Sequence, residues 1–255
     1  MVALFFVLKL KIMPEGPSIV ILKEEVQQFA GHKILEVSGS SSIDLERLEH
    51  KKIVEFRTWG KHFLICFEDF TVKIHLLMFG TYRINERKEL APRLSMVFSN
   101  GELNFYTCSI KILEGNINDH YQWNEDVMSE LWDSKKAQLS LSKVPDEMIC
   151  DALLDQNIFS GVGNIIKNEV LYRCRIHPES LVGKIPLEDL SWIIGESSVY
   201  SFEFLYWKKK NELKKHWLAH TKKTCLRCNL PLIKKHTGNK KRRSFFCTNC
   251  QKLHE

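Results

Sequence analysis

Residues 154–178 read LDQNIFSGVGNIIKNEVLYRCRIHP and combine turn signals with a helical pattern. Gly161 and Gly163 interrupt regular structure and Pro178 ends the segment, so we expect a helix over residues 164–174. Two glycines permit a close backbone approach, and the first N–H groups of the helix would be free to bind a phosphate. Asn164, at the helix start, would add a side-chain donor. The alternative for this segment is a simple helix-breaking turn.

The rest of the chain divides into a β-rich part before this segment and a helical part around it. Before residue 122 we expect one helix over residues 18–29 and strands over residues 34–37, 52–57, 62–67, 71–77, 94–98 and 103–106. Many short strands are typical of a sandwich or a barrel. From residue 123 to residue 220 we expect helices over residues 146–155, 164–174, 186–195 and 197–220.

The C-terminal tail carries the strongest local signal, which is a pair of C-x-x-C motifs. Eighteen residues separate the first pair from the second, and the four cysteines are Cys225, Cys228, Cys247 and Cys250. Such pairs can place four thiolates around one zinc ion, and metal binding can contribute about 10 kcal/mol of folding free energy to a short tail. We therefore predict one structural zinc ion bound by the four cysteines, with two strands between the cysteine pairs, at residues 230–235 and 244–246. The alternatives are redox dithiols or coincidence, and a zinc ribbon alone could bind DNA, RNA or protein.

Composition indicates an ordinary globular protein with a moderate excess of positive charge. The chain has 37 Lys and Arg against 31 Asp and Glu, and its C-terminal third holds many of the basic residues. This distribution suits a polyanion such as nucleic acid, although a solvated basic surface is the alternative. The four remaining cysteines, scattered singly, indicate core thiols in a reducing compartment. No apolar run is long enough to span a membrane.

The first twelve residues, MVALFFVLKLKI, are apolar and precede a short proline-containing motif. A secretory signal would start with basic residues and end at a small-residue cleavage site, and this segment has neither. We interpret residues 1–12 as an extension created by a start codon placed too early, with Met13 as the initiator. The alternative is an extra edge strand.

Removal of Met13 would give Pro14 a free secondary amine. An α-amino group has a pKa near 8, so such a nitrogen is substantially neutral and nucleophilic near physiological pH. Glu15 beside it could transfer protons as a general acid or base. If the preceding residues stay attached, Pro14 is a tertiary amide without this reactivity, and a proline inside a loop is the simpler interpretation.

The motif MPEGP at residues 13–17 resembles the start of the formamidopyrimidine-DNA glycosylase and endonuclease VIII family. Four more motifs follow in the family's order: WGKHFL at residues 59–64, HLLMFG at 75–80, the segment at 154–178, and the ribbon with RRSFFC at 242–247. The resemblance runs from Met13 to about Lys252. It implies an α+β multidomain fold, with a catalytic β-sandwich with flanking helices over residues 13–122, a helix-two-turn-helix domain over 123–221 and a zinc ribbon over 222–255.

The resemblance also implies a reaction and the residues that carry it out. Pro14 would attack the anomeric carbon of a damaged nucleotide, and β,δ-elimination would then cleave the strand. Glu15 matches the family's acid/base glutamate, and Lys61 matches a lysine that contacts phosphate and assists elimination. Gly163 and Asn164 belong to the DNA-binding segment. Arg242 matches the phosphate-binding arginine of the zinc hairpin, with Arg243 as the alternative if the register is shifted by one.

Two further DNA contacts and several departures follow from the same comparison of motifs. Met78 matches a wedge that fills the gap left by an extruded base, although residues 77–79 could instead be core residues at a strand end. Arg93 takes the place of a DNA-contacting histidine. Ser18 stands where the family usually has a second glutamate, residues 108–112 lack the purine branch's Arg-Phe pair, and the segment before Cys225 is short. These departures favour endonuclease VIII-like specificity.

We therefore expect a monomeric, zinc-containing DNA glycosylase and AP lyase of base excision repair, acting on damaged DNA in a bacterial-type cytoplasm, at the nucleoid, with no membrane partner. Oxidised pyrimidines and abasic sites are the favoured substrates, and a purine-type activity on formamidopyrimidines and 8-oxoguanine is an alternative. A blocked N-terminus would instead leave a non-catalytic binder of damaged DNA. A zinc-ribbon nucleic-acid module, with RNA as one candidate ligand, is the third hypothesis.

Overall fold

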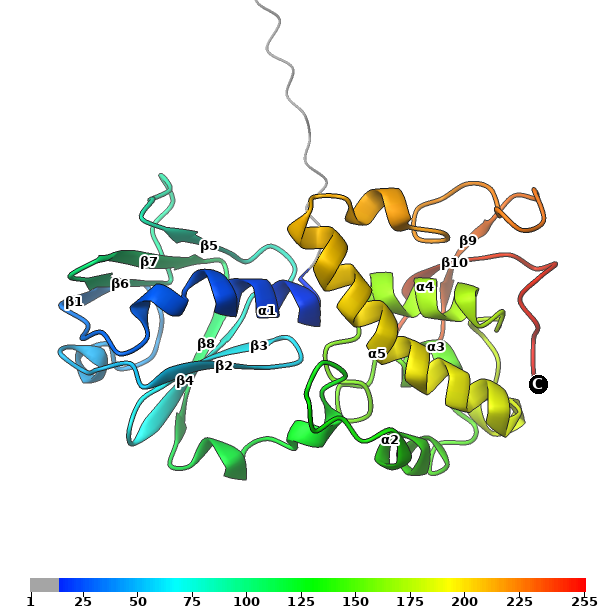
Figure 1. Cartoon of the computed structure of the whole chain (residues 1–255), viewed down its shortest axis with the longest axis horizontal. Helices are drawn as coiled ribbons and strands as arrows, with labels where there is room; N and C mark the ends of the chain where they lie inside the picture. The colour runs from blue at the N-terminus through cyan, green and yellow to red at the C-terminus, as the bar shows by residue number, and fades with distance from the viewer. Residues whose placement is uncertain (1–13) are drawn as a thin grey trace, which may run out of the picture.

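The computed structural model describes residues 14–255, so the predicted extension at residues 1–12 lies outside the described part. Two lobes lie side by side, with a two-stranded finger against the second lobe (Figure 1). The first lobe contains two antiparallel four-stranded sheets. One has the order β1 (Glu36–Ser38), β6 (Leu94–Phe98), β7 (Gly101–Tyr106), β5 (Thr81–Ile84), and the other β2 (Glu55–Trp59), β3 (His62–Cys66), β4 (Phe70–His75), β8 (Ser109–Glu114).

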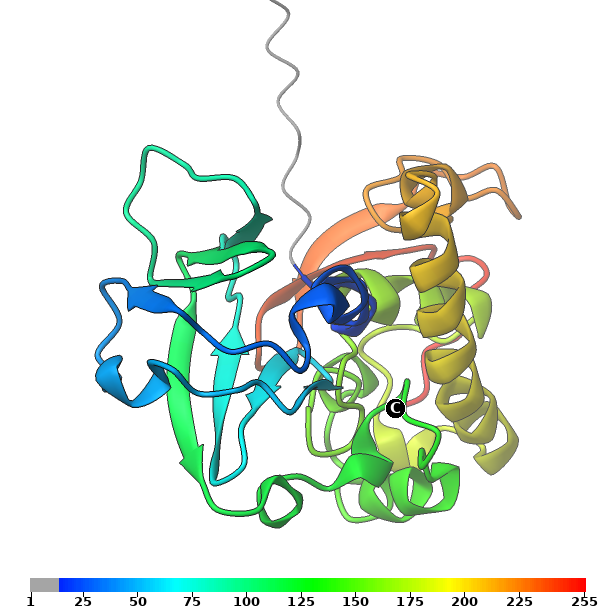
Figure 2. The ribbon, with the colours of Figure 1, turned by 60° about the vertical axis from the view of Figure 1, so that its left-hand side comes forward.

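Apolar side chains from both sheets form one core, which confirms the predicted β-sandwich. The ring of Phe63 from one sheet lies 5.8 Å from the ring of Phe105 from the other. Helix α1 (Gly16–Glu25) adds Ile19 and Leu22, both fully buried, to the same core. Helix α1 lies between the two lobes (Figure 2). The first residues of α1 are thus held between the sandwich and the helices.

The second lobe is helical and is crossed by one long helix. Its helices are α2 (Ser134–Leu141), α3 (Ile149–Ala152), α4 (Asn164–Arg173) and α5 (Leu187–Lys209), followed by a 3-10 turn at Leu213–His216. Helix α5 packs on α4 and also contacts α1 of the sandwich (Figure 1). None of the described helices is long and apolar enough to cross a membrane.

The structure differs from the expected elements at several places. Helix α5 is continuous where two helices were expected, because packing on α4, α1 and α2 outweighs the cost of Gly195 inside it. The helix expected at residues 146–155 is a single turn, since Met148 is extended and pairs with Leu181. Helix α2 and strands β5 and β8 were not predicted. Strand β8 pairs with β4, which lies far away in the sequence.

The finger consists of β9 (Ile233–Thr237) and β10 (Arg242–Phe246), joined by a turn at Gly238. Buried Lys167 of α4 donates hydrogen bonds to Ser244 Oγ at 2.8 Å and to the carbonyl of Arg243 at 3.2 Å. Tyr172 of the same helix packs in the small core around the cysteines. The finger is therefore fixed against the second lobe rather than suspended from it.

Candidate active site

A cavity of about 600 Å³ lies where the sandwich, the helical lobe and the finger meet. Its lining includes six residues singled out from the sequence: Pro14, Lys61, Met78, Gly163, Asn164 and Arg242. These residues come from five separate segments of the chain. His75, Leu77, Leu154, Gln156 and Lys240 complete the lining. The fold thus brings most of the predicted site residues to one place.

Pro14 lies next to a close approach of three glycine-containing segments, which are the start of α1, the Gly60 turn and the loop at Gly161. Gly16, two residues later, donates a backbone hydrogen bond to the carbonyl of Gly161 at 2.9 Å. A Cβ atom at Gly16 would lie 3.0 Å from Gly161 Cα, and one at Gly60 would lie 2.7 Å from Gly161 N. The predicted close backbone approach is therefore present at Gly161, where the backbone lies against the backbone of Gly16 and of Gly60.

Glu15 is fully buried and caps helix α4 from another lobe. Its Oε1 accepts a hydrogen bond from Ile165 N at 2.7 Å, and its Oε2 accepts from Gly163 N and Ile166 N, both at 3.2 Å. The expectation that the first N–H groups of this helix are free for a phosphate is wrong for Ile165 and Ile166, because the Glu15 carboxylate accepts hydrogen bonds from both. Burial raises the pKa of Glu15, while Lys61 and the three N–H groups oppose the shift. A raised pKa suits a proton donor.

Lys61 follows the Gly60 turn between β2 and β3, and its side chain enters the cavity. Its Nζ donates a hydrogen bond to the carbonyl of Val162 at 2.7 Å. The same carbonyl accepts from Gln156 Nε2 at 3.1 Å, and Gln156 Oε1 accepts from Gly161 N. Burial lowers the pKa of Lys61, the negative charge of Glu15 opposes this shift, and the positive charges of Arg242 and Lys240 lower the pKa further. The lowered pKa makes this ammonium group a stronger acid than that of an exposed lysine.

The loop before Lys61 is fixed by an aspartate that the sequence analysis did not identify. Asp126 is buried, accepts a hydrogen bond from Gly60 N at 2.8 Å through Oδ2, and accepts from Met128 N at 2.9 Å through Oδ1. Burial raises its pKa to about 6. No local motif marks this residue, because its role depends on a contact 66 positions away in sequence.

Asn164 begins α4 and lines the cavity. Its carbonyl accepts a hydrogen bond from Asn168 Nδ2 at 2.7 Å. Its side-chain oxygen Oδ1 is buried and has no hydrogen-bond partner within the described part of the chain. A buried polar atom without a partner carries a free-energy cost, which a ligand donor or a water molecule would remove.

The alternation of side chains along β10 separates the two arginines. Arg242 lines the cavity, whereas Arg243 is exposed. Burial lowers the pKa of His220 to about 4, and the positive charges of Lys167 and Arg243 contribute to this shift. Lys240 joins Arg242 at the cavity, and Lys240 Nζ donates to the carbonyl of Asp151 at 2.9 Å. The geometry therefore favours Arg242 for a contact in the cavity, as the sequence register predicted.

Residues 77–79 form an exposed apolar turn after β4. The exposed fractions are 48% for Leu77, 53% for Met78 and 60% for Phe79, which contradicts the alternative that they are core residues. His75 Nδ1 accepts a hydrogen bond from Leu77 N at 3.0 Å and so supports the turn, in which Leu77 has a positive φ of 54°. Arg93, by contrast, does not line the cavity and donates to the carbonyl of Ser40.

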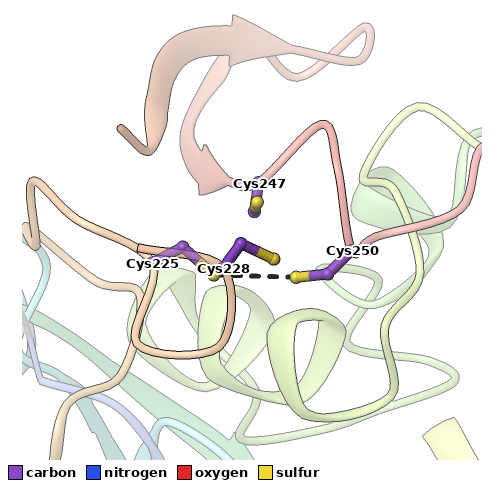
Figure 3. Close-up of side chains that lie close together, drawn as sticks. All are labelled: Cys225, Cys228, Cys247 and Cys250. Atoms are coloured by element: carbon purple, nitrogen blue, oxygen red, sulfur yellow. Dashed lines mark hydrogen bonds between the residues drawn. The ribbon is translucent and has the colours of Figure 1, made fainter. Parts of the chain in front are cut away.

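The four cysteines of the finger converge on one point (Figure 3). Their sulfur atoms all lie within 4.8 Å of one another, and Cys225 Sγ lies 3.6 Å from Cys250 Sγ. Four thiolates at zinc–sulfur distances of about 2.3 Å would lie about 3.8 Å apart. The donor set therefore fits a metal ion of the zinc type. The other cysteines, Cys66, Cys108, Cys150 and Cys174, are buried and free, as expected.

The fold and this site define a class of DNA-repair protein. The model of the formamidopyrimidine-DNA glycosylase N-terminal domain matches residues 13–108, and that of the formamidopyrimidine-DNA glycosylase H2TH domain matches residues 125–199. The two models together cover about two thirds of the chain. The chain belongs to the formamidopyrimidine-DNA glycosylase and endonuclease VIII family.

Relatives come from both branches of the family. The chain is 27% identical over 232 residues to Endonuclease 8-like 3 of Xenopus laevis, covering 86% of this chain and 38% of the relative. It is 29% identical to the formamidopyrimidine-DNA glycosylase of Mycoplasmopsis pulmonis, covering 94% and 98%. The chain spans about a third of the length of the Endonuclease 8-like 3 relatives that it matches.

Solved structures show the same fold. The Lactococcus lactis formamidopyrimidine-DNA glycosylase bound non-covalently to DNA with an AP site has a TM-score of 0.83 and 21% identity, over 93% of this chain and 99% of that one. A viral DNA glycosylase has a TM-score of 0.80 and 20% identity, over 93% and 100%. The predicted architecture of sandwich, helix-two-turn-helix lobe and four-cysteine finger is thereby confirmed.

Proposed function

We propose that this chain is a bifunctional DNA glycosylase and AP lyase that uses the nitrogen of Pro14. The observation that carries the proposal is the position of Pro14, at a cavity that Lys61, Asn164 and Arg242 also line, with Glu15 buried next to it in sequence. The proposed nucleophile and a set of phosphate-binding donors line one cavity, and the proposed acid is buried at the next position in the sequence.

The reaction follows from these groups. The Pro14 nitrogen lone pair forms a bond to C1′ of the damaged nucleotide, the bond from C1′ to the base breaks, and the base leaves with that electron pair and a proton. The sugar ring opens and an iminium ion remains. Loss of a C2′ proton then expels the 3′ phosphate, a second elimination expels the 5′ phosphate, and water releases the enzyme. In this proposal Glu15 and Lys61 move these protons, which is consistent with the raised pKa of Glu15 and the lowered pKa of Lys61.

DNA binding would use the basic side chains of the cavity and the exposed apolar turn at residues 77–79. Arg242 and Lys240 would hold phosphates of the strand, and Met78 would occupy the space left by the extruded base. The four cysteines would hold one zinc ion and thereby fix β10, which carries Arg242. We propose oxidised pyrimidines and abasic sites as substrates, a monomeric state and a cytoplasmic, nucleoid-associated location.

Trapping with borohydride tests the proposal, because it reduces the iminium ion to a stable covalent bond. Protein whose synthesis begins at Met13 should be trapped on DNA with an abasic site. The same protein acetylated at its terminal nitrogen is the matched control and should give no adduct. If the unblocked protein gives no adduct, the proposal fails.

A non-catalytic binder of damaged DNA is the second candidate, because thirteen residues precede Pro14 in the sequence. If they remain attached, the nitrogen is an amide and cannot attack. The intact mass of protein from its native host distinguishes the two functions: a mass that includes residues 1–13, together with lesion binding and no trapping, supports the binder.

A further inference from the structure

Pro14 lies between two cavities, and the second one differs from the first in its chemistry. The second cavity has a volume of about 400 Å³, which is within the range of small-ligand sites. Pro14 and Ser18 line it, together with Glu25, Tyr82 and Lys208. Within the described part of the chain, the first cavity is lined by three basic side chains, Lys61, Lys240 and Arg242, and by no carboxylate. The second cavity mixes donors and acceptors, as the edge of a nucleobase requires.

This inference rests on the proposed function. The attacked carbon C1′ carries the base, whereas the phosphates are attached through C3′ and C5′. If phosphates occupy the basic cavity, an extruded base would extend from C1′ into the other space at Pro14. A base must leave the helical stack to expose C1′, so a receiving space is needed.

Among residues 14–255, Lys208 is the only ammonium group in the lining of this second cavity, and it comes from the other lobe. It lies near the end of α5, and its Nζ donates to Ser18 Oγ on α1. Ser18 stands where the family usually has a glutamate, so the lysine meets a neutral hydroxyl there. No carboxylate among residues 14–255 forms an ion pair with Lys208. Burial lowers its pKa, with Glu15 and Glu25 opposing the shift.

The other charged groups of the cavity already have partners. Tyr82 donates its hydroxyl hydrogen to Glu25 Oε2, and Arg83 Nε lies 3.6 Å from Glu86 Oε2. An ammonium group has three N–H donors and no acceptor, and one donor of Lys208 is used by Ser18. As far as the described residues are concerned, two donors therefore remain for a ligand that offers acceptor oxygens.

We propose that Lys208 is a specificity-determining residue, which donates hydrogen bonds to carbonyl oxygens of the extruded base and so favours oxidised bases rich in carbonyl groups. A site that donates to a carbonyl discriminates against an amino group at the same position, because two donors would then face each other. The lysine takes no part in bond breaking.

A matched pair of substrates tests this role. 5-Hydroxyuracil and 5-hydroxycytosine differ at C4, where the first has a carbonyl oxygen and the second an amino group. The substitution Lys208→Met should lower kcat/KM for 5-hydroxyuracil by roughly 10- to 100-fold and reduce its preference over 5-hydroxycytosine at least about fivefold. The loss on abasic DNA, which has no base, should be at least about fivefold smaller. Lys208→Arg should restore part of the preference.

Lys209→Met is the matched control, because Lys209 pairs on the surface with Glu24 and does not line the cavity. This variant should leave all three rates unchanged. A Lys208→Met variant with equal losses on all three substrates, or with a lower unfolding temperature and no change in preference, would overturn the inference. Absence of trapping by the unsubstituted protein would instead reject the proposed function.

Discussion

Glu15 Oε1 lies 2.7 Å from the backbone nitrogen of Ile165, 150 residues away in the sequence. One carboxylate thus caps the N-terminus of helix α4 and, through these hydrogen bonds, connects the first helix of the sandwich to the helical lobe. The same side chain is the proposed acid of the reaction. Structural and chemical roles are combined in it, so a substitution should affect both.

Glu15→Gln should show this combination. The amide nitrogen cannot accept a hydrogen bond, so at least one N–H group of α4 loses its partner. The free energy of unfolding should fall by about 1–2 kcal/mol, and base excision should fall by about 10²- to 10⁴-fold. Denaturant titration and single-turnover kinetics measure the two effects. Glu24→Gln, on the exposed surface of α1, is the control, and a Glu15→Gln protein with normal excision would contradict the proposed role.

Asp126 should make stability depend on pH. Its pKa is raised from 3.8 to about 6, so the folded protein binds the proton more tightly than the unfolded chain. Stability from this group is therefore present at low pH and decreases as the pH rises from about 4 to about 6, by roughly 2–3 kcal/mol. Asp126→Asn should lose this component, which denaturant titrations from pH 4 to pH 7 would detect. Parallel pH profiles for the two proteins would refute the assignment.

Arg242 and Arg243 form a natural matched pair, because neighbouring residues of β10 point to opposite faces. Arg242→Ala should weaken binding to DNA and reduce the slope of log K against log salt by about 0.9, the value for one lost phosphate contact. Arg243→Ala should have a smaller effect on both quantities. Fluorescence anisotropy over a salt series would measure them. If the Arg243 variant shows the larger change, the cavity does not bind the backbone as proposed.

Met78→Ala should separate binding from stability. The side chain is 53% exposed, so the free energy of unfolding should change by no more than about 0.5 kcal/mol. Binding to lesion-containing duplex should weaken at least about fivefold, because an apolar wedge is lost. Leu90, another exposed apolar residue, provides the control substitution Leu90→Ala. Equal affinities of the two variants for this duplex would contradict the proposal that Met78 acts as a wedge.

Removal of the metal should act on the finger first. Chelation should disorder β9 and β10, because the cysteine cluster is a main part of their small core. Since β10 carries Arg242, DNA affinity should fall with it. Metal analysis by mass spectrometry should find one zinc ion per chain. Full activity after complete loss of the metal would break the proposed link between the finger and the site.

The sequence by itself determined the family, the sandwich with its helical lobe, and the positions of the four cysteines. These features are encoded locally, by residue spacing and by turns that each need only a short segment. The start of α4 at Asn164 is an example, since Gly163 before it and the helical pattern after it suffice.

Only the tertiary structure decided which residues the functional side chains contact. It showed that Glu15 accepts hydrogen bonds from N–H groups at the start of α4 and that Asp126 accepts one from Gly60 N. It also showed that Lys208, from the other lobe, donates a hydrogen bond to Ser18. It also showed that α5 is one continuous helix and that β8 pairs with β4. Each of these outcomes depends on contacts between residues distant along the chain, which burial and hydrogen-bond satisfaction fix and local sequence does not specify.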